Sequence, residues 1–480
     1  MDISNKEIEE IVRKVVANMS GDEQNAQPAT VATGVVINGK TYHGVFNDMN
    51  EAIEAAYQAQ RKLRDLSFEE REKFITVARR LILEEAEEMA KLGVSETGMG
   101  RVEHKILKHR YVAMKTPGTE DLVTEAISGD KGLMLLEMAP YGVIGAMTPS
   151  TNPSETVLCN SIGMIAGGNT VVFNPHPNAL MTSLYAVDLI NRAAIEAGLP
   201  QNMCCAVAKP TMETSDIMVK HPYIKMLCCT GGPGVVKAML SSGKKAIGAG
   251  AGNPPVIVDE TADIAKAGKD IIDGCTFDNN LPCIAEKEVF ALEAIADELI
   301  HHMIQAGAYL ISREQMLELE KVVLVDGKNG KKTINKKWVG RDAKLILKQI
   351  GINVGDEIRC VLCEAQEMDH FVQIELMMPI LAVVRVPDVD TAIKMAVKAE
   401  HGNRHTAHMH SKNIDNLSKF AREVETTIFV KNAPSYAGIG VGGEGHCTFT
   451  IAGPTGEGLT SARSFTRKRR CVMVDSFRIV

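Results

Sequence analysis

Apolar residues in the first 20 positions form a single stripe. They recur at steps of three and four residues, at Ile8, Ile11, Val12, Val15, Val16 and Met19. Charged side chains such as Glu9 and Arg13 occupy the other side, so the pattern predicts a short amphipathic helix. Residues 21–40 begin with a polar stretch that has no period, which indicates a flexible linker. A tethered helix needs a surface for its stripe, on its own body, on a sister subunit or on another protein.

Short apolar runs alternate with helical stretches between residues 141 and 259, and an amphipathic helical pattern precedes them at residues 47–92. Strands are predicted at residues 143–147, 170–173, 203–207, 224–228 and 256–258. Helices are predicted at residues 156–166, 180–197, 212–219 and 235–241. This alternation indicates a parallel sheet with crossover helices, and such sheets bind ligands at the carboxyl ends of their strands.

A second series of strands and helices starts at residue 263 and ends at about residue 429. Its strands are predicted at residues 288–292, 381–386 and 427–430. Residues 120–140 are too long for a simple loop, and the tail from residue 448 is rich in glycine and then β-like. These two segments are predicted to form a projecting sheet that joins subunits.

The composition is that of an ordinary globular protein of 480 residues, with 45% hydrophobic residues, 24% charged residues and a net charge of -7. This length suggests roughly two or three domains. The mildly acidic balance argues against nucleic acid as a partner. No apolar run reaches the roughly 18 residues of a membrane span, so we expect a soluble protein.

The 11 cysteines have no spacing typical of a disulfide framework, which favours a reducing cytosol. Cys360 and Cys363 fit a CxxC pattern, but the residues between them are apolar and no second pair follows, so we interpret them as strand packing. Four histidines lie close together in the sequence, at His401, His405, His408 and His410. No cysteine or carboxylate completes an obvious ligand set, so no metal site is predicted.

The most informative single residue is Cys283, a thiol at a predicted turn after Asn279, Asn280 and Pro282. A thiolate is a strong nucleophile, and a helix end or a nearby cation can lower the pKa of the thiol. The alternative is an ordinary packed cysteine, because free cysteine behaves as a small hydrophobic residue. Cys275 competes as the nucleophile, but it falls within the preceding helical pattern and is interpreted as core.

Three other segments carry features of the same site. Residues 148–153 follow a strand and open a helix, where backbone N–H groups favour anions and Asn152 can donate two hydrogen bonds. Residues 230–234 connect a strand to a helix, and their glycines allow a phosphate to approach the backbone. They lack the G-x-G-x-x-G fingerprint, so alone they are weak evidence for a dinucleotide. Residues 248–255 form a glycine-rich loop before a strand.

Together with the Cys283 turn, these segments resemble the aldehyde dehydrogenase superfamily, and specifically its coenzyme-A-acylating branch from bacterial microcompartments. The resemblance covers essentially the whole chain. Its most specific pieces are residues 95–100, 148–153, 248–255, 277–287, 375–379 and 454–458. Within the branch, the propionaldehyde dehydrogenases are most similar and the acetaldehyde-specific enzymes are a near second.

The resemblance implies an α/β fold with a Rossmann-type parallel-sheet cofactor domain, an α/β catalytic domain and a β oligomerisation arm. The implied parts are an encapsulation helix at 1–20, a linker at 21–40, a nucleotide-binding domain at 41–258 with 120–140 in the arm, a catalytic domain at 259–446 and an oligomerisation segment at 447–480. It also implies a homo-oligomer, a dimer or a tetramer, inside a microcompartment of the bacterial cytoplasm. The partner of residues 1–20 would be a shell protein.

The resemblance also implies a role for each matching residue. Cys283 would attack the aldehyde carbon, and after hydride transfer to NAD it would carry a thioester. The Cys283 backbone N–H and a donor from the Thr151-Asn152 turn would hold the oxyanion. An ungapped count places Thr151 at the oxyanion position, but Asn152 is preferred because an amide N–H is a fixed donor. The implied cofactor-binding residues are Thr148, Pro149, Ser150, Asn174, His176, Thr230, Gly231, Gly232 and Glu375.

The sequence departs from the hydrolytic branch of the family at two places. One concerns the release of the acyl group, and the other concerns the part of the NAD site that would bind adenosine. The glutamate that activates water in that branch has no counterpart, because its position falls at about Gly248. The lysine after the second strand is also missing, and Asn174-Pro175-His176-Pro177 stands there. Without the glutamate, water attacks the thioester slowly and a thiol has the advantage. This difference favours transfer of the acyl group to coenzyme A.

The resulting hypothesis is an NAD-dependent oxidation of a short-chain aldehyde, with propanal favoured, that yields propionyl-CoA and NADH. Two alternatives within enzymes are an acetaldehyde-specific acylating enzyme and a hydrolytic enzyme that releases the free acid. A third, from a different class, is a shell-associated interaction protein that has lost its activity. The intact turn around Cys283 argues against this last interpretation.

Overall fold

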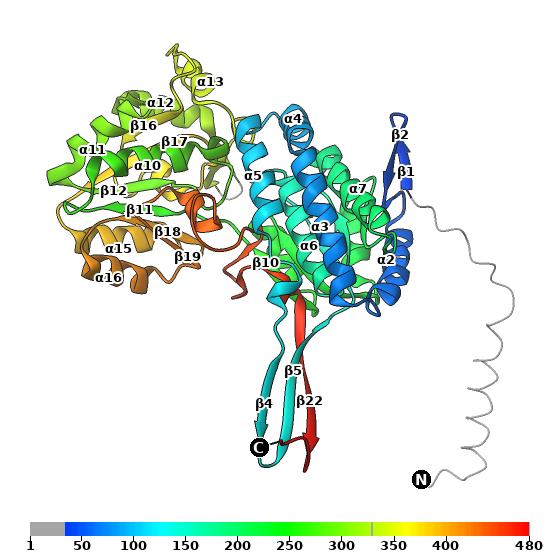
Figure 1. Cartoon of the computed structure of the whole chain (residues 1–480). Coiled ribbons are helices and arrows are strands. Elements are labelled where there is room, and N and C mark those ends of the chain that lie inside the picture. The colour runs from blue at the N-terminus through cyan, green and yellow to red at the C-terminus, as the bar shows by residue number, and fades with distance from the viewer. Residues whose placement is uncertain (1–33, 328–329, 480) are drawn as a thin grey trace, which may run out of the picture. The chain divides into compact units, whose positions relative to one another are not determined.

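Two parallel sheets carry the fold of residues 34–327 and 330–479, which this computed structural model describes (Figure 1). The first sheet has six strands in the order β10-β9-β6-β7-β8-β3, and the second has seven in the order β13-β16-β17-β12-β11-β18-β19. The predicted α/β class is therefore confirmed. The helix expected at residues 1–20 and the linker as far as residue 33 lie outside the described residues. The rest of the expected linker, residues 34–40, is not a linker, because it enters the antiparallel strands β1 (Gly34–Ile37) and β2 (Lys40–His43).

All neighbouring strands of the first sheet are parallel. They are β3 (Val45–Phe46), β6 (Val143–Met147), β7 (Thr170–Asn174), β8 (Cys204–Val207), β9 (Ile224–Thr230) and β10 (Lys245–Ala249). Met147 at the end of β6 is opposite Asn174 on β7 and Cys229 on β9. The segments that follow these three strands therefore leave the sheet at one edge, as predicted.

The helices around this sheet include those predicted, with bounds shifted by a few residues, and a further one at Val102–Lys115 that was not predicted. They are α2 (Met49–Leu63), α3 (Phe68–Glu84), α4 (Ala86–Thr97), α5 (Val102–Lys115), α6 (Pro153–Ala166), α7 (Leu180–Glu196), α8 (Met212–Lys220) and α9 (Pro233–Leu240). All 14 residues of α6 are buried, including polar ones such as Glu155 and Asn160. Within the described part of the chain, no helix combines the length and apolar character of a membrane span.

The second sheet is also parallel throughout. Its strands are β11 (Pro255–Val258), β12 (Glu288–Leu292), β13 (Ala308–Ile311), β16 (Cys360–Glu364), β17 (Ile380–Val386), β18 (Thr406–His410) and β19 (Ile428–Lys431). Its helices include α10 (Ile264–Thr276), α11 (Glu293–Gln305), α12 (Arg313–Val323), α13 (Ala343–Leu347), α14 (His370–Gln373), α15 (Val389–Ala399) and α16 (Ile414–Val424). Cys360 and Cys363 are buried in β16, so the interpretation of the CxxC pattern as strand packing is confirmed.

The boundary expected after residue 258 is several residues too late. β11 was predicted as the last strand of the nucleotide-binding domain, but it pairs with β12 and β18 in the second sheet. A short apolar run has the same pattern in either sheet, and only strand pairing decides which sheet it joins. The chain therefore passes from the first sheet to the second before Pro255.

The predicted third sheet is present, with the antiparallel strands β4 (Glu125–Gly129), β5 (Gly132–Pro140) and β22 (Thr466–Val474) side by side in Figure 1. Only β22 of the expected C-terminal segment belongs to it. Between residues 447 and 465, Cys447, Phe449 and Phe465 are buried in the core beside the first sheet. The expected oligomerisation segment at 447–480 therefore falls into two parts. The apolar residues before β22 are buried in a core, and β22 belongs to the third sheet.

Residues 95–100 connect α4 to α5 and bring three parts of the fold together. The Glu96 carboxylate accepts hydrogen bonds from the backbone N–H groups of Met181 and Thr182, at 2.7 and 2.8 Å, and so caps the start of α7. Gly100 has a φ of +78°, and a Cβ there would lie 2.1 Å from Asp278 Oδ1. Only glycine allows this close approach of α5 to the turn at Asp278.

We expect the substitution Gly100→Ala to destabilise the protein, because its methyl group would displace Asp278 and its φ is unfavourable for alanine. The cost is about 1–2 kcal/mol from the left-handed conformation alone, and a thermal melt should show a lower Tm. Gly129→Ala is the matched control, because Gly129 is in β4 and a Cβ there meets no atom within 4 Å. A Tm for Gly100→Ala equal to that of the control would contradict the expected contact.

Candidate active site

Three consecutive left-handed residues form the turn that precedes Cys283. Asp278, Asn279 and Asn280 have φ values of +49°, +54° and +67°. Asparagine and aspartate tolerate this conformation better than other non-glycine residues, which explains why they occupy the turn. Hydrogen bonds hold it, because Asn279 Nδ2 donates to Gly340 O at 3.0 Å and Asn280 Nδ2 donates to Glu286 O at 3.0 Å. The conformation of the turn is therefore fixed by bonds to the segment at Gly340 and to the segment at Glu286.

Cys283 lies where two hydrophobic cores meet. Leu281 is buried in the core around the second sheet, and Ile284 is buried in the core around the first. Nine of the eleven cysteines are buried, whereas Cys283 has intermediate exposure and Cys471 is exposed on β22. The buried position of Cys275 confirms its interpretation as a core residue. Cys283 is thus the one partly exposed thiol among the described residues outside the third sheet.

The pKa of the Cys283 thiol is raised to about 12, chiefly by burial and further by the Glu375 carboxylate. The Lys287 ammonium opposes this rise without overcoming it. The lowered pKa that a nearby cation could have produced is therefore not found. The resting thiol is protonated, so its activation requires a proton acceptor or an added positive charge when substrates bind.

The charges of Lys287 and Glu375 act on the Cys283 thiol in opposite directions. Lys287 is 3% exposed, and its ammonium donates to the backbone oxygen of Asn280 at 3.2 Å. Burial raises the pKa of Glu375, while Lys287 and the backbone N–H of Gly252 oppose the rise. A Cβ on Gly252 would lie 2.9 Å from the carbonyl oxygen of Cys283. The glycine-rich segment 248–255 therefore packs directly against the nucleophile.

No carboxylate occupies the position at which the hydrolytic branch carries its base. Gly248 lies within β10, and a Cβ there would meet Val236 Cγ1 at 2.8 Å, so a larger side chain has no space. The Glu286 carboxyl group is close in sequence to the thiol but accepts from the backbone N–H of Ser435 at 2.8 Å. A Cβ on Gly274 would lie 2.1 Å from Glu286 Oε1, so this carboxyl group packs against α10.

Asn152 lies at the start of α6 but makes no cap with its side chain. It is 7% exposed, and its Oδ1 accepts a hydrogen bond from Lys108 Nζ at 2.7 Å. Its Nδ2 donates to Thr151 Oγ1 at 3.3 Å. The amide nitrogen has two hydrogen atoms, so a second donor remains for a substrate.

Lys108 belongs to a buried cluster of two lysines and two carboxylates, which we call the charge quartet: Lys105, Lys108, Glu155 and Asp278. All four are at most 3% exposed. Lys108 Nζ lies 2.6 Å from Asp278 Oδ2 and 2.7 Å from Glu155 Oε1, and Lys105 Nζ lies 3.0 Å from Asp278 Oδ2. Two basic and two acidic side chains therefore meet within the quartet.

The quartet shifts the pKa of each member. Burial alone would raise the pKa of Glu155, but Lys108, His109 and Lys105 lower it to about 2. Burial also opposes the charged form of Asp278, yet the two lysines hold its pKa well below the usual range. The pKa of Lys108 is raised, because Asp278 and Glu155 outweigh its burial. Glu155, Asp278 and Lys108 are therefore charged near neutral pH, whereas burial lowers the pKa of Lys105.

Sequence reasoning missed Lys105, Lys108 and Glu155. A signal was present in α5, where Lys105 and Lys108 share the helix face that carries the buried Val112. Two lysines at core positions of a helix indicate buried ion pairs.

The predicted cofactor residues gather at the carboxyl edge of the first sheet. Thr148, Asn174 and Thr230 end or directly follow the neighbouring strands β6, β7 and β9. Beyond β9, a Cβ on Gly231 or Gly232 would meet no atom within 4 Å, so a phosphate has access to the backbone.

Individual donors at this edge differ in their availability. The hydroxyl oxygen of Thr148 is buried and has no hydrogen-bond partner among the described residues. The Asn174 amide is engaged by α8, since its Nδ2 donates to Ser215 Oγ at 2.7 Å and its Oδ1 accepts from Thr214 Oγ1 at 2.8 Å. The His176 ring accepts from the backbone N–H of Asn178 and has intermediate exposure. An open glycine segment and an unpaired hydroxyl fit a dinucleotide.

The histidines of the 401–410 segment do not gather into a ligand set. His405, His408 and His410 are buried in or beside β18, and burial lowers the pKa of His405 to about 4. His401 Nε2 is 2.9 Å from the backbone oxygen of Gln373. Over the part of the chain that the structure describes, no group of three or more potential metal ligands is found.

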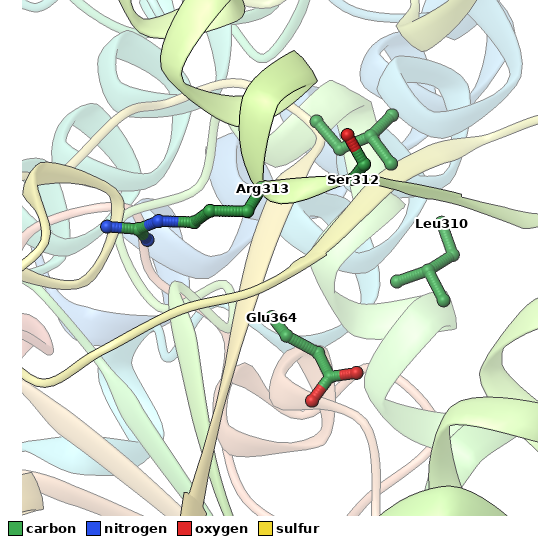
Figure 2. Close-up of a pocket in the computed structure, with 5 residues that line it drawn as sticks. Leu310, Ser312, Arg313 and Glu364 are labelled. Atoms are coloured by element: carbon green, nitrogen blue, oxygen red, sulfur yellow. The ribbon is translucent and has the colours of Figure 1, made fainter.

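A separate hollow of about 390 Å³ lies on the side of the second sheet where the carboxyl ends of its strands are (Figure 2). It is lined by Leu310, Ile311, Ser312, Arg313 and Glu364, at the carboxyl ends of β13 and β16. Cys283 precedes β12 and so lies at the amino-terminal edge of the same parallel sheet. The Arg313 guanidinium already pairs with Asp369, at 2.8 Å. This hollow is therefore distinct from the candidate active site.

Comparisons with known proteins agree with this arrangement. The acetylating acetaldehyde dehydrogenase EutE of Salmonella typhimurium is 45% identical over 480 residues, which are 100% of both chains. A propionaldehyde dehydrogenase structure from the fucose-utilisation microcompartment of Clostridium phytofermentans has a TM-score of 0.89 and 58% identity, covering 91% of this chain and 100% of that one. The Rhodopseudomonas palustris propionaldehyde dehydrogenase, solved with bound CoA and an acylated cysteine, has a TM-score of 0.88 and 54% identity over 90% and 98% of the two chains.

These relatives confirm the resemblance to the coenzyme-A-acylating branch and the expected fold class. The aldehyde dehydrogenase family also matches residues 23–454, nearly the full length of the described fold. The partly exposed Cys283 turn between the two parallel sheets agrees with this match. The chain belongs to the aldehyde dehydrogenase family.

Proposed function

We propose that this protein oxidises a short-chain aldehyde with NAD and transfers the acyl group to coenzyme A through a thioester on Cys283. The partly exposed Cys283 thiol at the end of a rigid turn carries the proposal. Relatives that are named acylating dehydrogenases support the reaction class. Propanal is the favoured substrate, because two similar structures are propionaldehyde dehydrogenases, and acetaldehyde is the alternative.

In the first step, the Cys283 thiol would give its proton to the acceptor that its raised pKa requires, and the sulfur would attack the aldehyde carbon, so that the carbonyl oxygen becomes an oxyanion. The Cys283 backbone N–H and the free hydrogen of Asn152 Nδ2 are the proposed donors to this oxyanion. Thr151 is the weaker candidate, because its hydroxyl can rotate and already accepts from Asn152. Cys283 would then carry the acyl group as a thioester, because NAD would supply a hydride acceptor when bound.

The proposed NAD site uses the carboxyl edge of the first sheet. Thr230, Gly231 and Gly232 would approach the pyrophosphate and nicotinamide, with Thr148, Pro149 and Ser150 beside them. His176 would contact the adenosine, and Glu375 the nicotinamide ribose. Asn174 would act through α8, because its amide holds Thr214 and Ser215. The domain roles follow, with nucleotide binding by the first sheet and catalysis by the second.

Transfer of the acyl group to coenzyme A is favoured because the position of the hydrolytic branch's base carries no carboxylate. Gly248 has no space for a carboxylate, and the Glu286 carboxyl group packs against α10. The thiol of coenzyme A is a better nucleophile than unactivated water. These observations favour acyl transfer over hydrolysis.

We expect NADH formation from propanal to stop after about one turnover when coenzyme A is omitted, and to continue when it is added. The physical reason is the slow attack of water on the Cys283 thioester. The measurement is NADH absorbance after rapid mixing, with enzyme concentrations high enough to resolve a burst. Sustained turnover without coenzyme A would instead indicate the hydrolytic reaction.

The control for this experiment removes the nucleophile. Cys283→Ala should abolish both the burst and the sustained rate, which would also exclude a background reaction. Cys471→Ser is the matched variant, because this exposed cysteine lies on β22 and should retain activity. Substantial turnover by Cys283→Ala would refute the nucleophile assignment.

The third sheet is proposed to join copies of the chain into a dimer or a tetramer. Val472 and Val474 point to the same side of β22 and are 58% and 62% exposed. Replacing both with lysine should lower the mass measured by light scattering, because charges would disrupt an apolar contact. Met212→Lys is the control, since Met212 is 82% exposed on α8. An unchanged mass in the double variant would contradict this role of the sheet.

Residues 1–20 are proposed to bind a microcompartment shell protein through their apolar stripe, which places the enzyme inside a compartment of the bacterial cytoplasm. Fused to a fluorescent protein, they should produce puncta in cells that assemble the shell. Val12→Glu with Val16→Glu would interrupt the stripe and should make the fluorescence diffuse. Diffuse fluorescence of the unaltered fusion would count against the proposal.

A further inference from the structure

Lys108 connects the two halves of the proposed oxyanion site. Its ammonium contacts the side-chain oxygen of Asn152 at 2.7 Å, and Asp278 in the turn before Cys283 at 2.6 Å. Asn152 starts α6 beside the first sheet, and Asp278 follows α10 beside the second. One fully buried ammonium therefore bonds both the candidate donor and the segment that carries the nucleophile.

We propose that Lys108 is a positioning residue that holds the amide of Asn152 with its oxygen inward and its nitrogen toward the oxyanion. The inference rests on the proposed role of Asn152. It selects between Asn152 and Thr151 as the side-chain donor, which sequence position alone leaves open.

The chemistry of the two groups makes the orientation unique. The oxygen and nitrogen of an amide have similar size, so packing alone does not distinguish an amide from its flipped form. An ammonium has three donors and no acceptor, so it can bond only the oxygen of the amide. A flipped Asn152 would face Lys108 with N–H groups and present its oxygen to the oxyanion, which would be unfavourable on both sides.

The rest of the charge quartet keeps the ammonium in place. Asp278 and Glu155, at 2.6 and 2.7 Å, stabilise the positive charge of Lys108 away from water. Lys105 balances the second negative charge from 3.0 Å. Lys105 contacts the backbone oxygen of Thr151 at 3.5 Å, and no hydrogen bond links it to the Asn152 side chain. Lys105 therefore serves as an internal comparison for Lys108.

A purely structural role for Lys108 makes a different prediction from a role through Asn152. If Lys108 only stabilised the Asp278 turn, its loss would affect the reaction whether or not Asn152 is present. If it acts by orienting the amide, its loss has no further effect once the amide is gone. A double-mutant cycle separates the two possibilities.

The cycle uses the single-turnover rate of NADH formation with saturating propanal and NAD. Asn152→Ala should lower this rate about 10²–10³-fold, as expected for the loss of an oxyanion donor. Lys108→Gln should lower it up to about 10²-fold through misorientation of the amide. The double variant K108Q/N152A should be no slower than Asn152→Ala alone. KM for propanal should change little, because the donor acts in the transition state.

The matched comparison replaces Lys105 in the same cycle. The losses of Lys105→Gln and Asn152→Ala should multiply, because Lys105 does not bond the amide. Should Lys108→Gln fail to fold, the charge-balanced pair K108Q/E155Q takes its place, since it removes one cation and one anion together. Folding of each variant is checked by its Tm.

Losses that multiply for Lys108 and Asn152 in any folded variant would overturn the positioning role. A wild-type rate in Asn152→Ala would overturn it as well, by removing Asn152 from the proposed mechanism. Neither outcome touches the proposed reaction, which fails only if Cys283→Ala retains turnover or if hydrolysis proceeds without coenzyme A.

Discussion

The buried ion pairs of the charge quartet hold the parts of the candidate active site in register. Lys108 bonds Asp278 and Asn152, which belong to segments beside different sheets. Removal of one partner of such a pair leaves a buried charge uncompensated, at a cost of about 3–5 kcal/mol. The contacts of Lys108 make the contribution of the quartet a geometric one. It specifies where the turn before Cys283 lies relative to the start of α6.

The two parallel sheets contribute opposite edges to the site. The first sheet supplies the carboxyl ends of β6, β7 and β9, where loops open onto ligands. The second supplies the amino-terminal side of β12, where Cys283 follows a left-handed turn. Leu281 and Ile284 pack into different cores on either side of the thiol. The nucleophile is therefore held by the junction of the cores, with little freedom to move.

The surroundings of Cys283 favour the protonated form of its thiol. Burial raises the pKa of the thiol, and the Glu375 carboxylate adds to the rise. Lys287 lies close enough to oppose them, and it is tied to the same turn through Asn280. Val236 leaves no space for a larger side chain at Gly248, so no group at this position can activate water. The missing base at this position favours transfer of the acyl group to an incoming thiol over hydrolysis.

The sequence alone determined the alternation of strands and helices, Cys283 as the candidate nucleophile and the glycine segments, because these depend on local periodicity and on residues with special backbone or chemical properties. Tertiary structure decided which sheet β11 joins, since strand pairing is not encoded in a short apolar run. It also decided that the residues before β22 complete a core. The charge quartet and the orientation of Asn152 came from the structure as well, because contacts between residues more than 40 positions apart depend on how the helices pack.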